Sequence, residues 1–132
     1  MTTGIRRTLL VLLLGIAGYN INIAQTNLVV NGDFSQGNTG FTSSYNLASS
    51  LYAEGTYAIV TNANTVHSNF TGFDHTSPPN GRFLAVNGAG SPGINVWCQT
   101  VSVTPNTEYN FTTWVNSLVG SSPAVLQFSI NG

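Results

Sequence analysis

The sequence predicts an all-β sandwich, and three observations carry that prediction. Residues 124–130 alternate between apolar and polar side chains, as a strand with one covered face does. Residues 94–115 form two apolar-polar stretches separated by a turn sequence, Thr104–Thr107. Two further stretches, 55–61 and 82–87, are rich in β-branched and aromatic residues, which strands favour.

The central hairpin, residues 94–115, organises the rest of the chain. Pro105 lacks an N–H and has a fixed φ, so it ends the first strand and begins the turn. The residues expected to face the core share one parity on each side of that turn. They are Trp97, Val101 and Val103 before it and Tyr109, Phe111 and Val115 after it.

The remaining elements follow in order. Residues 27–34 predict a strand that ends in a turn, with Phe34 in the core, and residues 41–45 predict a weaker strand. No helix is expected over 47–53, because the stretch is short and contains two serines. Residues 62–81 are expected to form a long functional or mobile loop.

The last strand, residues 124–130, is expected to direct Ala124, Leu126, Phe128 and Ile130 inward. Asn131-Gly132 then follows, a dipeptide typical of a two-residue hairpin turn. A turn signal without a following strand predicts a domain that is truncated at its C-terminus and lacks at least one strand.

The first 24 residues have the layout of a secretory signal peptide, with Arg6 and Arg7 before an apolar run. The run is shorter than the roughly 18 residues of a membrane span, so an uncleaved anchor is the less favoured alternative. Residues 25–132 are then one secreted or cell-surface domain.

Only 5% of the residues are charged, and Arg82 is the one fixed cation after residue 24. Without cations the chain has little attraction for nucleic acid or anionic lipid, so neither is expected as a partner. A neutral, Asn- and Thr-rich surface suits a polyhydroxylated ligand and an extracellular structural protein equally well. Cys98, the only cysteine, is expected to be a small buried hydrophobe.

Three segments, 27–34, 96–103 and 109–114, resemble carbohydrate-binding modules of the galactose-binding-like jelly-roll group, as found in large secreted bacterial proteins. The segments Asp74–Thr76 and Pro123–Gly132 also have counterparts there. The resemblance implies a jelly-roll sandwich and, in many members, glycan binding. It also implies a structural Ca²⁺, for which Asp33 would be a ligand, although Ser35 replaces the glutamate common in the family.

The candidate ligand-binding residues are Trp114, Asn116 and Gln127. Trp114 has the opposite parity to the expected core residues, so its indole is expected on the outer face, where it can stack on a sugar. Asn116 and Gln127 can supply amides to sugar hydroxyls. The alternative is that a loop or further strands cover Trp114.

His67, Asp74 and His75 are the only cluster of transition-metal ligand types, but their spacing matches no zinc motif, and a hydrogen-bonding role in the loop is favoured. No nucleophile motif or pair of carboxylates is recognisable, so no enzyme is expected. The sequence therefore predicts a non-catalytic carbohydrate-binding module whose partners are polysaccharides and other domains of a longer chain. The alternative is a structural or adhesive β-sandwich of a cell-surface protein without glycan binding.

Overall fold

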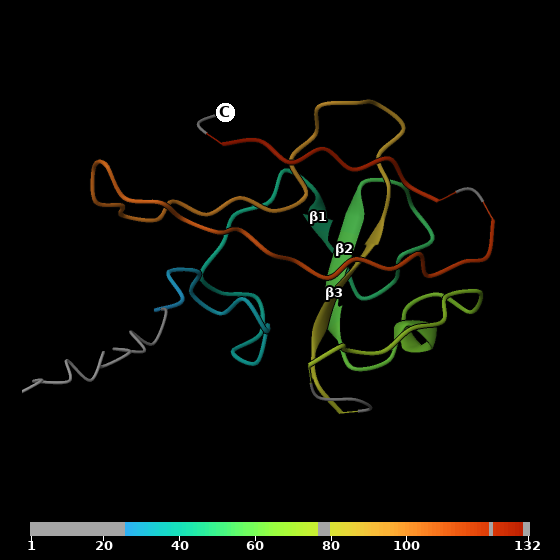
Figure 1. Ribbon diagram of the computed structural model, residues 1–132. Coiled ribbons are helices and arrows are strands. Elements are labelled where there is room, and N and C mark those ends of the chain that lie inside the picture. Colours follow the sequence, from blue (N-terminus) through green and yellow to red (C-terminus); the bar gives the residue numbers. More distant parts are fainter. Residues whose placement is uncertain (1–25, 77–79, 122, 131–132) are drawn as a thin grey trace, which may run out of the picture.

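The computed structural model describes residues 26–76, 80–121 and 123–130 and is mostly non-helical. Its one sheet has three strands in the order β1 (Asn46–Leu47), β2 (Thr56–Val60) and β3 (Phe83–Asn87) (Figure 1). β1 is parallel to β2, and β3 is antiparallel to it. A single 3₁₀ turn, η1 (Ala63–Thr65), follows β2. The low helix content agrees with a β-rich fold. The signal-peptide prediction and the Asn131-Gly132 turn fall outside the described residues.

β2 and β3 confirm the two strands predicted over 55–61 and 82–87. They pair in a register that sets Ala58 opposite Ala85, and both alanines are buried. Tyr57 is also buried, and its hydroxyl donates to Asn38 Oδ1 at 2.9 Å. Because adjacent residues of a strand point to opposite faces, the middle of β2 is covered on both sides.

The core is built largely from the segment expected to be a loop. Residues Ala63, Val66 and Phe70 are buried against Leu51 and the two strand alanines. Asn62 begins η1 by accepting the N–H of Asn64, which lets the chain turn and bring Val66 inward. The segment 62–70 is therefore structural, because β2 and β3 together carry too few large apolar side chains to form a core without it.

The N-terminal strand predicted over 27–34 is wrong, because residues 27–30 form no strand, but the turn predicted at its end is confirmed at residues 31–33. Asn31 has a φ of 53° and a buried side chain, whose Nδ2 donates to the carbonyls of Gly37 (2.9 Å) and Thr39 (2.8 Å). Its Oδ1 accepts the N–H of Gln36. The carboxamide thus satisfies loop backbone groups that a β-ladder would otherwise pair. Phe34, predicted in the core, is half-buried edge-on against Phe41.

The turn of the central hairpin is confirmed, but its strands are not formed in the described residues. Asn106 follows Pro105 with a φ of 57°, the left-handed conformation that asparagine tolerates in a turn. The N–H of Thr104 donates to the hydroxyl oxygen of Tyr109 at 2.7 Å, which lowers the pKa of Tyr109. The only ladder contact of this region is the antiparallel bridge between Thr42 and Cys98.

The inward orientation predicted for the hairpin and for residues 124–130 is wrong, because no second layer among the described residues covers those side chains. Trp97 is half-buried. The exposed ones are Val101, Val103, Tyr109, Phe111, Val115, Ala124, Leu126, Phe128 and Ile130. The alternation still leaves a trace, since Phe128 stacks on Phe111 with ring centroids 4.1 Å apart, whereas Val125 is 98% exposed.

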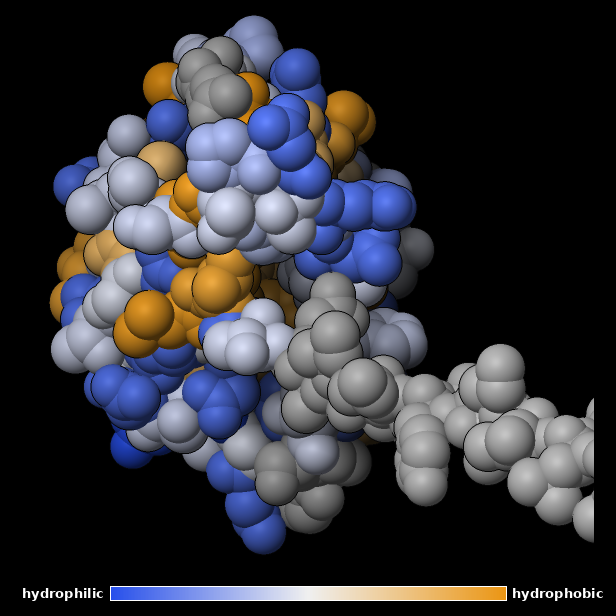
Figure 2. Space-filling model, turned by 60° about the vertical axis from the view of Figure 1, so that its left-hand side comes forward, coloured by the Kyte–Doolittle hydropathy of each residue, from blue (hydrophilic) through white to orange (hydrophobic). Residues whose placement is uncertain are grey.

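The segment 111–119, which is the end of the hairpin and the residues that follow it, runs across the sheet in front of β2 and β3 (Figure 1). It is fixed at its far end, where the carbonyl of Leu118 accepts the N–H of Thr71 at 2.8 Å. Leu118 and Val119 also pack on the core cluster. The surface has apolar side chains gathered between hydrophilic ones (Figure 2). Within the described residues, no helix has the length and hydropathy of a membrane span.

Candidate functional site

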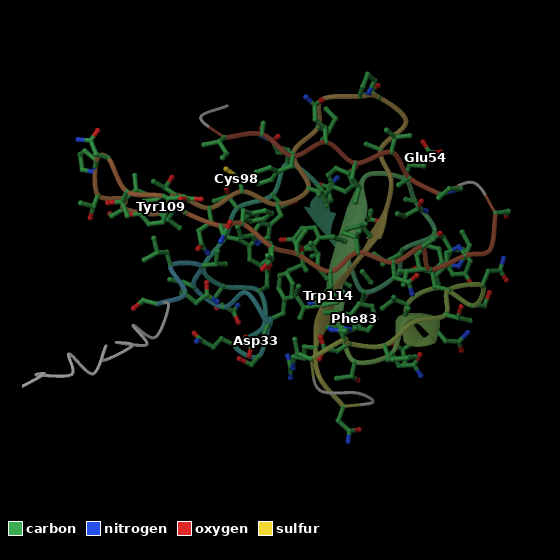
Figure 3. The ribbon with its side chains drawn as sticks, viewed as in Figure 1. Asp33, Glu54, Phe83, Cys98, Tyr109 and Trp114 are labelled. Atoms are coloured by element: carbon green, nitrogen blue, oxygen red, sulfur yellow. The ribbon has the colours of Figure 1, made fainter. Side chains whose placement is uncertain are left out.

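Trp114 is exposed and is backed by a histidine. It lies on the segment that crosses the sheet, and in Figure 3 it appears in front of β3. The side chain is 72% exposed, but Val115, of the opposite parity, is 70% exposed, so the parity on which the prediction rested does not explain the exposure. One face of the indole stacks on His75, with ring centroids 3.6 Å apart and an angle of 26° between the planes. The histidine therefore covers one face, and the indole keeps most of its remaining surface open to solvent.

The position of His75 depends on its neighbour Asp74, which is buried. The hydroxyl of Thr76 donates to Asp74 Oδ2 at 2.7 Å. Gly81 lies so close to this carboxylate that a Cβ at position 81 would overlap it. Asp74 thereby fixes the backbone on either side of His75, and the imidazole projects outward against Trp114.

A polar hollow of about 290 Å³ is lined by both sequence neighbours of His75, although neither His75 nor Trp114 lines it. Asp33 and Asp74, far apart in the sequence, meet at the hollow. Among the described residues, the lining consists of Asp33, Ser35, Asp74, Thr76, Asn80, Gly81 and Arg82. Sequence reasoning placed Asp33 alone at a candidate site and missed Asp74 as its partner, because the two residues lie far apart in the sequence and only the folded chain brings them to one hollow.

Asp33 is exposed and is held by Ser35. Its Oδ1 accepts the N–H of Ser35 at 3.2 Å and the Ser35 hydroxyl at 2.9 Å. The backbone hydrogen bond, followed by the hydroxyl, lowers the pKa of Asp33. Both bonds favour the ionised form, so the carboxylate is available as an anionic ligand.

The side chains of the hollow offer oxygen atoms, the type of ligand atom that a hard cation prefers. Two carboxylates, two hydroxyls and the Asn80 amide are the ligand types that Ca²⁺ takes, in a set of roughly six to eight oxygens. Arg82 lines the same hollow, and its positive charge opposes a cation. Asp33 and Asp74 would hold the ion, with the hydroxyls and amide completing part of the shell. The calcium prediction stays a prediction.

Asn116 and Gln127 lie on exposed segments, as expected for residues available to a ligand. In the described part of the chain, neither side chain makes a hydrogen bond, so both amides keep their full bonding capacity for a partner. Neither of them lines the polar hollow.

His67 does not join Asp74 and His75. Its ring lies between those of Tyr52 and Phe70, with both centroid separations at 4.2 Å. Its Nδ1 accepts the N–H of Asn69 at 3.2 Å, in line with the hydrogen-bonding role predicted for the loop. Among the described residues, no three His, Cys, Asp or Glu side chains gather as a metal site would need.

A second hollow, of about 330 Å³, follows the Thr42–Cys98 bridge. Cys98 lines it and is exposed, so the prediction of a buried thiol is wrong. Mid-strand position predicts burial only where a second layer covers the strand, and the described residues supply none here. This hollow runs along a structural contact and has no aromatic platform of the Trp114 kind.

Comparison with models of known protein families, with curated proteins and with solved structures found no match to this chain.

Proposed function

We propose that the protein is a non-catalytic carbohydrate-binding module of the extracellular space. The observation that carries the proposal is the exposed indole of Trp114, which is backed by His75. The sequence neighbours of His75, Asp74 and Thr76, line a polar hollow. Sugar rings present apolar C–H faces and polar rims. A flat aromatic surface with hydrogen-bonding groups at its side complements both features.

The stack on His75 supports this function energetically. A free indole on an extended segment would lose rotational freedom when a ligand binds, at a cost of about 0.5–1.5 kcal/mol per immobilised side chain. Contact with the imidazole restricts the indole before the ligand arrives. The near absence of charge also favours a neutral glycan, because desolvating a neutral surface is less costly than desolvating ions.

For the fold, we propose a jelly-roll sandwich whose second layer is formed by the extended segments 94–103, 108–119 and 123–130. The crossing of the sheet by residues 111–119 and the Phe111–Phe128 stack support this arrangement. Amide hydrogen exchange tests it, since strand pairing would protect the alternate amides of residues 123–130. Uniformly fast exchange there would contradict it.

Retention of the purified protein on insoluble and gel-embedded neutral polysaccharides tests the function. We expect Trp114→Ala to abolish retention and Trp114→Phe to keep part of it, because a smaller flat ring remains. His75→Ala should weaken retention less than Trp114→Ala, since the platform stays but loses its support.

Val125→Ala is the matched control, because Val125 is 98% exposed and makes no ring contact. All variants should keep the wild-type thermal unfolding midpoint within a few degrees. A wild-type protein that no polysaccharide retains, or a Trp114→Ala variant with unchanged retention, would overturn the proposal.

A second candidate function, a structural or adhesive building block of a cell-surface protein, is favoured by a different observation. The segments 101–103 and 123–130 expose apolar side chains, and contiguous apolar surface marks protein contacts. This alternative predicts association with neighbouring domains of a longer chain and no retention on any glycan. Val125→Asp should then weaken that association, whereas Trp114→Ala should leave it unchanged.

A further inference from the structure

Tyr52 repeats the construction found at Trp114. Its side chain is 63% exposed, and one face of its ring lies against the imidazole of His67, with centroids 4.2 Å apart. Both histidines come from the single segment 62–76. The structure therefore presents two exposed aromatic rings, and each of them is covered on one face by a histidine.

The support beneath Tyr52 reaches the core. His67 stacks in turn on Phe70, at 4.2 Å and with 18° between the planes, and Phe70 is buried among the core residues. The three rings form a continuous column from the interior to the surface. Its outer end is the free face of Tyr52, which cannot sink inward because the column is already filled.

The hydroxyl group fixes the rotation of the ring. Tyr52 Oη hydrogen-bonds to Ser68 Oγ at 2.9 Å and accepts the N–H of Ser68 at 3.2 Å. An exposed tyrosine ordinarily keeps its hydroxyl free for water, and two bonds to one neighbour leave the ring little freedom. Order of this kind at an exposed position lowers the entropy lost on binding a ligand.

We propose that Tyr52 is a second sugar-stacking position, so that the protein takes glycan chains through two aromatic platforms rather than one. This inference rests on the glycan-binding function proposed for Trp114 and specifies its ligand as a polymer or long oligosaccharide. Two linked contacts raise avidity through effective concentration without any new contact at Trp114. A ligand that reaches only one platform gains nothing from the other.

Phe73 is the internal comparison. It is 68% exposed, more than Tyr52, but its ring stacks on no other ring within the described residues. If exposure alone made a platform, Phe73 would bind as well as Tyr52. If backing by histidine is the determinant, Phe73 contributes nothing.

The test measures retention in polysaccharide gels and, separately, the affinity for a tri- or tetrasaccharide of the same glycan by calorimetry. Tyr52→Ala should lower polymer affinity about tenfold and leave oligosaccharide affinity at Trp114 unchanged. Tyr52→Phe, which keeps the ring and loses only the hydroxyl bonds, should lose at most about threefold. Phe73→Ala should match the wild type.

The outcomes separate this inference from the function on which it rests. Unchanged polymer affinity in Tyr52→Ala, with loss in Trp114→Ala, overturns the second platform and leaves the function standing. Loss of oligosaccharide affinity in Tyr52→Ala overturns the separation into two platforms. Absence of any glycan binding by the wild type overturns both. Because Tyr52 is exposed, we expect its replacement to leave the fold intact. The unfolding midpoint of each variant checks this.

Discussion

The carboxamide of Gln99 pairs with both backbone polar groups of Val30. The N–H of Val30 donates to Gln99 Oε1 at 2.8 Å, and Gln99 Nε2 donates to the carbonyl of Val30 at 2.9 Å. Nε2 also donates to the carbonyl of Gly40. A side chain here replaces the peptide group of a neighbouring strand and ties the N-terminal segment to the central hairpin.

Replacing Gln99 with leucine removes these bonds while keeping a side chain of similar size. Val30 is exposed, so water takes over part of the bonding, and we expect the free energy of unfolding to fall by about 1–2 kcal/mol. Urea denaturation followed by fluorescence measures it. Gln127→Leu is the matched control, since its amide bonds to no described residue, and it should change stability by less than about 0.5 kcal/mol. Equal effects of the two substitutions would contradict the role of Gln99.

Gly81→Ala should displace the carboxylate of Asp74 and, with it, the backbone that carries His75. Overpacking of this kind typically costs about 1–3 kcal/mol. A Cβ at Gly88, by contrast, would have its nearest neighbour, Ala124 Cβ, at 4.0 Å, so Gly88→Ala should be close to neutral. Thermal unfolding measures stability, and tryptophan emission in a Trp97→Phe background, where Trp114 is the remaining indole, reports the stack. Unaltered emission and stability in Gly81→Ala would show that Asp74 does not position His75.

The sequence predicted best those elements whose pattern is local. β2 and β3 lie within the predicted ranges because β-branched and aromatic residues favour a pleated, covered surface whatever else the chain does. The turn at Pro105 and Asn106 was likewise predictable from two residues alone.

The errors have a common physical origin. The alternation of side chains along a strand shows which residues share a face, but it does not show whether another layer covers that face. Cys98 and Phe128 lie on strand-like stretches and are exposed because no layer of the described residues packs over them. Phe70 shows the converse, since a residue in a polar loop is buried when the loop folds back on the sheet. The stacks of His67 on Tyr52 and of His75 on Trp114 join residues that are distant in the sequence, so no local sequence pattern predicts them.

The lowered pKa of Asp33 makes a small part of stability depend on pH. A carboxylate whose pKa is lower in the folded state stabilises the fold above the ordinary aspartate pKa and loses that contribution as pH falls through the lowered value. Asp33→Asn should therefore differ from the wild type in unfolding midpoint at neutral pH and converge with it in acid. Glu108→Gln, which removes an exposed carboxylate without a hydrogen bond among the described residues, is the control. If the difference in unfolding midpoint between Asp33→Asn and the wild type grew toward acid pH, the direction of the Asp33 pKa shift would be contradicted.

Calcium provides the last test of the polar hollow. If Asp33 and Asp74 hold the ion, Ca²⁺ binds the folded state alone and raises the unfolding midpoint. At a Ca²⁺ concentration ten times the dissociation constant, the free energy of unfolding increases by about 1.4 kcal/mol. Because only two carboxylates line the hollow and Arg82 lies beside them, we expect half-saturation near millimolar Ca²⁺, the range of weak extracellular sites. Mg²⁺ should have less effect, since it requires a stricter octahedral geometry.

Asp33→Asn separates the ion site from the fold, because Asp33 is exposed whereas Asp74 is buried and anchors its loop. The variant should unfold near the wild-type midpoint in chelator and lose the calcium-dependent increase. Arg82→Gln should do the opposite and tighten binding several-fold, because it removes the opposing charge. A calcium response that survives in Asp33→Asn would place the ion elsewhere, and a wild-type protein without any response would remove calcium from the hollow.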